Sequence, residues 1–172
     1  MFELKKLSIN DGIDVYNMYQ DIPKEENGLF NGANGLTLEE FKNYLIKKDN
    51  EANQVGLVDG WKVPSTTYIL YVDGVPVGYA SLRHFLTDAL RVQGGHIGYG
   101  IAKSYRGKGY GKEILKRMLS EAKKIGIDEA LITTYPDNLA SQKVILANGG
   151  REVDRNDHHV YFLVKTKELM EG

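Results

Sequence analysis

The chain has 172 residues, of which 42% are hydrophobic and 26% are charged. These values are typical of a single globular domain with one hydrophobic core, and they exclude a disordered, collagen-like or coiled-coil protein. A formal net charge of -1 provides no basic field for nucleic acid or an anionic membrane, and the lack of cysteine excludes disulfides, thiolate metal sites and a thioester intermediate on the chain. The first ten residues lack the apolar core of a signal peptide, and no run reaches roughly 18 apolar residues, so we expect a cytoplasmic protein with no membrane or nucleic-acid partner.

The N-terminal part of the sequence predicts a strand and two helices with a loop between them. Apolar and polar residues alternate over 2–9. Ile13, Tyr16 and Tyr19 then recur at helical spacing, and Asp21-Ile-Pro23 ends the segment. Residues 25–35 contain three glycines and three asparagines but few apolar side chains, which predicts an exposed connection or flap. A capping box, Thr37-Leu-Glu-Glu40, marks the start of the second helix.

The middle of the sequence predicts a hairpin, a third long strand and an amphipathic helix. Residues 66–72 are rich in β-branched and aromatic side chains, Asp73-Gly74 forms a turn, and the strand resumes over 75–82. Residues 87–95 connect this hairpin to a strand over 95–101, and a helix follows from about Tyr110 to Ile125. The apolar stripe of that helix consists of Ile114, Leu115, Met118, Leu119, Ala122 and Ile125.

The C-terminal part predicts a buried strand over 130–135, a helix and a closing hairpin. The helix begins at Pro136-Asp137 and runs through Ala147, before the pair Gly149-Gly150. The closing hairpin consists of strands near 152–155 and 159–164. There is no internal repeat and no long linker, so we expect residues 1–172 to form one domain.

The segment Arg106-Gly-Lys-Gly-Tyr-Gly111 lies between the strand over 95–101 and the amphipathic helix. Glycine at every second position lets the backbone turn its amides toward one point. The first turn of the helix adds unpaired amides and a partial positive charge, which favour a bound phosphate. The pattern therefore predicts a phosphate-binding loop, and a tight turn whose glycines serve only packing is the alternative.

Two other phosphate-binding motifs fit this loop less well. A P-loop requires Ser or Thr after Gly-Lys, whereas Gly111-Lys112 is followed by Glu113. A dinucleotide fingerprint has the spacing G-x-G-x-x-G early in a βαβ unit, whereas this loop has G-x-G-x-G far along the chain. Binding of a nicotinamide or flavin nucleotide is therefore a minor alternative.

The loop and its surroundings resemble the GNAT superfamily of acyl-CoA N-acyltransferases. The signature of that family, a strand, Arg/Gln-x-x-Gly-x-Gly/Ala and a helix, matches Arg106 to Gly111, and the wider run from His96 is similar to the family's fourth strand. A second landmark, an Asn before a helix that ends in a glycine pair, is similar to Asn138 through Gly150. The resemblance implies a single N-acetyltransferase domain of the α+β class (α/β, three layers). Its sheet would be splayed, mixed and mostly antiparallel, with about seven strands and helices on both faces.

The same resemblance implies acetyl-CoA as the acetyl donor. The backbone of Ile101 would pair with the pantetheine arm. The residues that would hold the pyrophosphate are Arg106, Gly107, Lys108, Gly109, Tyr110 and Gly111. Asn138 would bind the pantetheine or position water beside it, and Ser141 would approach it from the same helix, unless both are only helix-start side chains.

The acid and the base for transfer are less evident. His96 stands about where the family often has a Glu, and imidazole has an unperturbed pKa of about 6.5, so His96 is the predicted base, with a structural sheet histidine as the alternative. Ile145 stands where an acid Tyr is expected in the family. Tyr135, at the end of the fifth long strand, is therefore the predicted acid, with a packing role as the alternative.

The sequence leaves the acceptor unidentified. We expect direct transfer of the acetyl group to an amine of a small molecule or peptide, with the acceptor wall in residues 13–61, including Trp61. A noncatalytic CoA-binding module or sensor is the alternative, because the usual acid Tyr is missing. No metal site is expected, since His84 and His96 lack a carboxylate pattern. The family also allows a homodimer through the closing hairpin.

Overall fold

The computed structural model describes residues 1–57 and 62–169, so the predicted wall residue Trp61 lies outside the described residues. The elements in chain order are β1 (Phe2–Lys6), α1 (Ile13–Gln20), β2 (Glu25–Glu26), β3 (Leu29–Phe30), α2 (Leu38–Asn53), β4 (Ser65–Val72), β5 (Val75–Arg83), α3 (Asp88–Val92), β6 (Ile97–Ile101), the 3-10 helix η1 (Lys103–Tyr105), α4 (Tyr110–Lys124), β7 (Glu129–Thr134), α5 (Leu139–Ala147), β8 (Arg151–Arg155) and β9 (Val160–Lys165).

The longer strands form two antiparallel sheets that separate between β6 and β7. The strand order is β1-β4-β5-β6 in the larger sheet and β7-β9-β8 in the smaller one. An isolated bridge joins Gly95 to Ile132, and within the described residues no ladder continues from it along β6 and β7. The predicted α+β fold with a splayed sheet of about seven strands is therefore confirmed. The two-residue strands β2 and β3 pair separately as a small hairpin.

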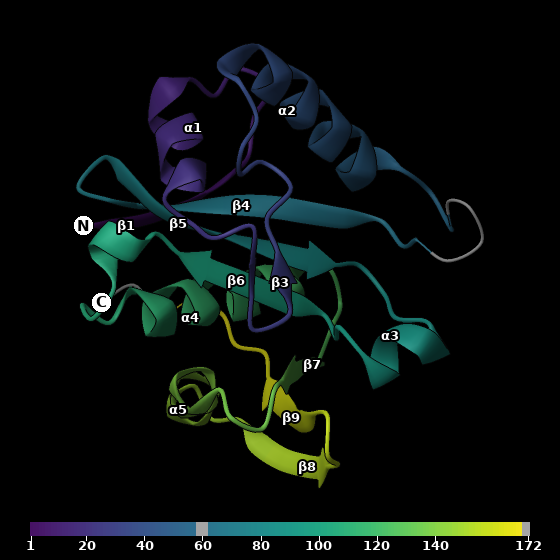
Figure 1. The fold of residues 1–172 in the computed structure, drawn as a ribbon. Helices are drawn as coiled ribbons and strands as arrows, with labels where there is room; N and C mark the ends of the chain where they lie inside the picture. The colour runs from purple at the N-terminus through teal and green to yellow at the C-terminus, as the bar shows by residue number, and fades with distance from the viewer. Residues whose placement is uncertain (58–61, 170–172) are drawn as a thin grey trace.

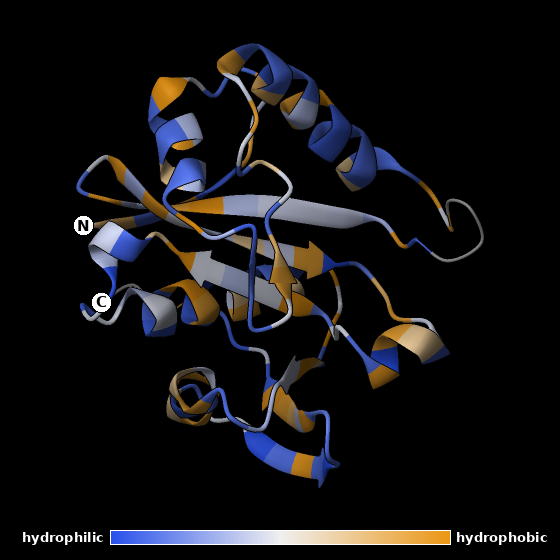
Figure 2. Ribbon diagram, in the orientation of Figure 1, coloured by the Kyte–Doolittle hydropathy of each residue, from blue (hydrophilic) through white to orange (hydrophobic). Residues whose placement is uncertain are grey.

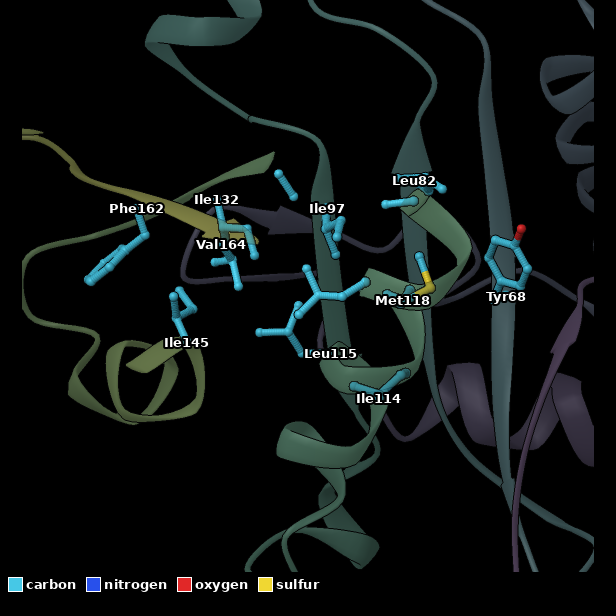
Figure 3. Close-up of a cluster of buried hydrophobic side chains, with 14 of the residues drawn as sticks. Tyr68, Leu82, Ile97, Ile114, Leu115, Met118, Ile132, Ile145, Phe162 and Val164 are labelled. Carbon is cyan, nitrogen blue, oxygen red and sulfur yellow. The ribbon is translucent and has the colours of Figure 1, made fainter. Parts of the chain in front are cut away.

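Helices cover both faces of the larger sheet. Figure 1 shows α1 and α2 on one face and α4 on the other, with α5 beside the smaller sheet. One buried cluster, drawn in Figure 3, joins Met118 of α4 to Leu82 of the larger sheet and to Ile132 and Phe162 of the smaller sheet. The two sheets therefore share a single core despite their separation. By contrast β8, an edge strand, is exposed along its whole length and mostly hydrophilic (Figure 2).

Local sequence signals account for several boundaries. Thr37 and Glu40 form the predicted capping box at the start of α2. The β4–β5 hairpin turns at Asp73 and Gly74, both with positive φ, as the sequence predicted. The predicted stripe of α4 is buried except for Ile125, which follows the last helical residue and is 47% exposed.

Two segments that were predicted as plain connections contain regular structure. Residues 25–35 include the β2–β3 hairpin, and the side-chain amide of buried Asn31 donates to the carbonyls of Tyr19 and Ile22 at 2.9 and 3.0 Å. That bonding anchors a polar segment to the end of α1, which its low apolar content did not predict. Residues 87–95 contain α3, whose N-cap is Thr87. The helix predicted from Pro136 begins at Leu139 instead, because Asn138 caps it.

Candidate active site

The glycine loop presents a row of free amides at the start of α4. Gly107 and Gly109 have φ of 78° and 83°, and a Cβ at either position would meet no atom within 4 Å. In the part of the chain that the structure describes, the amides of residues 107–112 donate to no protein acceptor. The amide of Glu113 is the first in α4 with an acceptor, the carbonyl of Gly109 at 3.3 Å. These free amides at a helix start suit a bound anion such as pyrophosphate.

The side chains of the loop contribute unequally to this anion site. Lys108 and Lys112 are exposed and lie beside the free amides in sequence. The ring of Tyr110 packs against Phe2 at 5.9 Å between centroids, so Tyr110 contributes its backbone amide and not its side chain to the anion site. The guanidinium of Arg106 bonds elsewhere: its Nε donates to the carbonyl of Ile101 at 3.0 Å, and its Nη atoms donate to Glu26 at 3.1 and 2.5 Å.

Strand β6 has an open edge beside the loop. The Ala102 amide donates to the Val77 carbonyl at 2.8 Å, and the adjacent register pair is Gly78 with Ile101. Since hydrogen-bonded and non-hydrogen-bonded pairs alternate along an antiparallel ladder, the amide and carbonyl of Ile101 point away from β5. The carbonyl accepts from Arg106, as described above, so the amide of Ile101 is the group that an extended ligand can use.

Residues of β7 and α5 form the wall across the separation from the open edge of β6. Asn138 caps α5 by accepting from the Ser141 amide at 3.3 Å, and the Ser141 hydroxyl lies 3.2 Å from the Tyr99 hydroxyl. Thr134 is on the same face of β7 as Ile132, and its buried Oγ1 has no hydrogen-bond partner among the described residues. A buried hydroxyl without a partner at the separation of the sheets suits a ligand that supplies one. The sequence analysis did not identify Thr134.

His96 is buried where the two sheets meet. Its amide donates to the Leu131 carbonyl at 2.7 Å, and its Nδ1 accepts from the Leu131 amide at 2.9 Å. Burial, together with the charges of Arg91 and Arg83, lowers the pKa of His96 to about 4. The ring is therefore neutral: Nε2 carries the proton, and the lone pair of Nδ1 already accepts the hydrogen bond from the Leu131 amide. This geometry argues against His96 as the base and favours its alternative role in holding the sheets together.

Gly95 also belongs to this junction. A Cβ at Gly95 would lie 2.4 Å from the Leu131 carbonyl oxygen, and its φ is +67°. Glycine is therefore required for the approach of the two sheets.

Tyr135 lies on the face of the sheets opposite to the face that α4 covers, and the free amides lie at the start of α4. It follows the end of β7 on the face that carries Leu131 rather than Ile132. Its ring is 5.9 Å from the ring of His159, and its hydroxyl would lie 3.1 Å from a Cβ on Gly28. The structure thus brings Tyr135 to the β2–β3 hairpin and to the closing strand, and it keeps His96 apart from them in the sheet junction.

The fold is similar to solved structures of GNAT-family and other N-acetyltransferases. Similar chains include the GNAT-family acetyltransferase of Streptococcus pneumoniae (15% identity, 95% of this chain and 97% of that chain, TM-score 0.61). Another is an N-acetyltransferase of Staphylococcus aureus Mu50 (16% identity, 97% and 99%, TM-score 0.63). A third is the Campylobacter jejuni N-acetyltransferase PseH, in complex with acetyl coenzyme A (13% identity, 97% and 100%, TM-score 0.62). At these identities the likeness shows the fold.

The family follows from the sequence itself. Residues 2–151 match the model of the acetyltransferase (GNAT) domain. The chain therefore belongs to the GNAT acetyltransferase family, and the predicted resemblance is confirmed. Over residues 1–57 and 62–169, no helix is both long enough and apolar enough to cross a membrane, and no three His, Asp or Glu side chains group as metal ligands.

Proposed function

We propose that this protein transfers the acetyl group of acetyl-CoA directly to an amine of a small molecule or peptide. The observation that carries the proposal is the row of free amides at residues 107–112 beside the open edge of β6. Membership of the acetyltransferase family supports it, as does the orphaned Thr134 hydroxyl in the separation between the sheets. Acetyl-CoA would supply the acetyl group as a reactive thioester.

The residues around the separation have distinct roles in this proposal. The amides of residues 107–112 bind the pyrophosphate, with Lys108 and Lys112 adding positive charge. The Ile101 amide donates to the pantetheine arm as an added strand would. Asn138, Ser141 and Thr134 form the facing wall and orient the arm from β7 and α5.

Orientation carries much of the proposed catalysis. A primary amine must be neutral to attack, which costs roughly 4 kcal/mol at pH 7. Holding the amine and the thioester together in the correct geometry offsets a cost of this size without a strong base. When the amine displaces the thiol of CoA, the C–N bond would form, the C–S bond would break and the acetylated nitrogen would lose its proton to water. Tyr135 is the proposed proton donor to the leaving thiolate, because it follows β7 at the separation of the sheets and its hydroxyl contacts the hairpin.

Release of free CoA thiol tests this function. The purified protein is mixed with acetyl-CoA and a panel of polyamines, amino acids, aminoglycosides and peptides, and thiol is measured against a no-acceptor control. Turnover with at least one amine supports the proposal. Tight binding of CoA by calorimetry without turnover over a broad panel would favour the noncatalytic module, and stabilisation by nicotinamide or flavin nucleotides but not by CoA would overturn the acetyl-CoA site.

The remaining predictions concern the location and the oligomeric state of the protein. A cytoplasmic location and a homodimer through β8 and β9 stay proposals, which cell fractionation and analytical ultracentrifugation test.

A further inference from the structure

The β2–β3 hairpin lies across the separation between the two sheets. The side chain of Leu29 packs on β6 where Gly98 and Gly100 leave space, since Cβ atoms there would lie 3.4 and 2.8 Å from its methyl groups. One residue earlier, Gly28 meets the ring of Tyr135 at the end of β7. The hairpin therefore contacts both strands that border the proposed active site, on the face opposite α4.

This hairpin is too small to hold its own position. Each of its strands has two residues, and Glu25, Gly28 and Phe30 are exposed. A two-stranded hairpin of this size is at best marginally stable in water. Its placement must therefore come from contacts with the rest of the chain.

A two-point ion pair joins the hairpin to the pyrophosphate loop. The two oxygens of Glu26 accept from the two Nη atoms of Arg106, 80 residues away, while Arg106 Nε is held by the Ile101 carbonyl. All three guanidinium nitrogens are thus used within the protein. A two-point pair of this kind fixes direction as well as distance, unlike a single surface ion pair.

A second tether joins the same two regions. The Asp21 carboxylate accepts from the Ser104 amide at 2.9 Å, and the Asp21 carbonyl accepts from the Lys103 amide at 3.0 Å. Asp21 lies just before the hairpin, and η1 lies just before Arg106. Asp21 joins the segment before the hairpin to η1, and Glu26 joins the hairpin itself to Arg106, so the two regions are connected at two points.

We propose that Arg106 is a positioning residue, which holds the β2–β3 hairpin over the acceptor side through Glu26 and couples that hairpin to occupancy of the pyrophosphate loop. The inference rests on the proposed function, which assigns the loop to CoA, and on the expectation that residues 13–61, which include the hairpin, form the acceptor wall. Backbone amides bind the pyrophosphate, and the Arg106 side chain keeps its pair with Glu26. A loop fixed by CoA then fixes the hairpin.

Hydrogen exchange of residues 24–31, followed by mass spectrometry with and without CoA, tests the coupling. In the wild-type protein we expect CoA to slow exchange of the hairpin amides. Glu26→Gln should speed that exchange about fivefold without CoA and abolish the response to CoA, because a half-exposed two-point pair stabilises by an amount of this order. The affinity for CoA should change by less than about threefold, since the free amides are untouched.

Two variants serve as controls. Glu25→Gln removes the same charge from the adjacent exposed residue, for which the described structure contains no ion pair, and it should behave as wild type. Reversing the pair with Glu26→Arg and Arg106→Glu together should restore slow exchange of the hairpin. With an acceptor found in the thiol-release panel, Glu26→Gln should raise the KM for the acceptor several-fold.

Other outcomes would overturn the coupling. If CoA speeds exchange of the wild-type hairpin, the phosphates take Arg106 from Glu26 and the assigned role is wrong. Equal hairpin exchange in wild type and Glu26→Gln, both without CoA, would show that the pair does not hold the hairpin. If the wild-type protein binds no CoA, the proposed function fails, and the comparison without CoA still decides the role of the pair.

Discussion

Substituting Gly109 by Asp and, separately, by Asn tests the placement of the pyrophosphate. The φ of Gly109 is 83° and a Cβ there has open space, so either side chain fits. Asn and Asp also tolerate the left-handed region better than most other residues. The two variants are nearly equal in shape and differ by one negative charge, so their comparison isolates electrostatics.

The expected difference follows from Coulomb's law. Two unit charges about 4 Å apart repel by roughly 1 kcal/mol in water and by about 4 kcal/mol at an effective dielectric constant of about 20. Because the loop is exposed, we expect a loss near the lower end, about 1–2 kcal/mol, which makes the Asp variant about 5- to 30-fold weaker for CoA than the Asn variant. Isothermal titration calorimetry measures this difference, and it should shrink in high salt.

A distant glycine provides the control. Gly126, at the other end of α4, also has positive φ and open space. Gly126→Asp should leave the affinity for CoA unchanged. If the folded Asp and Asn variants of Gly109 bind CoA equally at low salt, the loop does not hold the pyrophosphate.

Three further predictions concern the sheet junction and the proposed acid. Gly95→Ala should destabilise the fold by about 2–4 kcal/mol, because its Cβ collides with the Leu131 carbonyl, whereas Gly126→Ala should cost only about 1–2 kcal/mol from backbone strain; urea denaturation compares them. The pKa of His96 is lowered to about 4 by burial, so stability is full above about pH 6.5 and falls by about 2–3 kcal/mol as the pH drops toward 4. Denaturation at several pH values should show a smaller fall for His96→Gln, and an equal fall would contradict the assignment. Tyr135→Phe should lower kcat about 10- to 100-fold with CoA affinity unchanged, and an unaltered kcat would exclude Tyr135 as the acid.

The features that the sequence predicted are those with a local cause. The glycine loop and the apolar stripe of α4 depend on residues within one turn or one loop, so their spacing is visible in the sequence. The capping box of Thr37 and Glu40 has the same property. The family resemblance rests above all on the glycine loop, which explains why the fold class was predictable.

The features that were missed depend on contacts between distant segments. Nothing near His96 in the sequence indicates that its Nδ1 accepts from the amide of Leu131, 35 residues away. The pair of Glu26 with Arg106 spans 80 residues and has no local signal. Only Gly98 and Gly100, two glycines on one face of a strand, offered a usable clue that another segment approaches closely there.

The bare face of β6 has a consequence for how acceptor preference can change. At Gly98 and Gly100 the strand contributes no side chain, so the side chains of the hairpin, residues 25–30, determine the shape of this surface. Substitutions within six exposed or half-exposed positions can therefore reshape the surface while the β5–β6 ladder stays intact. A side chain added at Gly100 instead collides with Leu29 at 2.8 Å. Directed variation of this protein toward new amines is best confined to the hairpin.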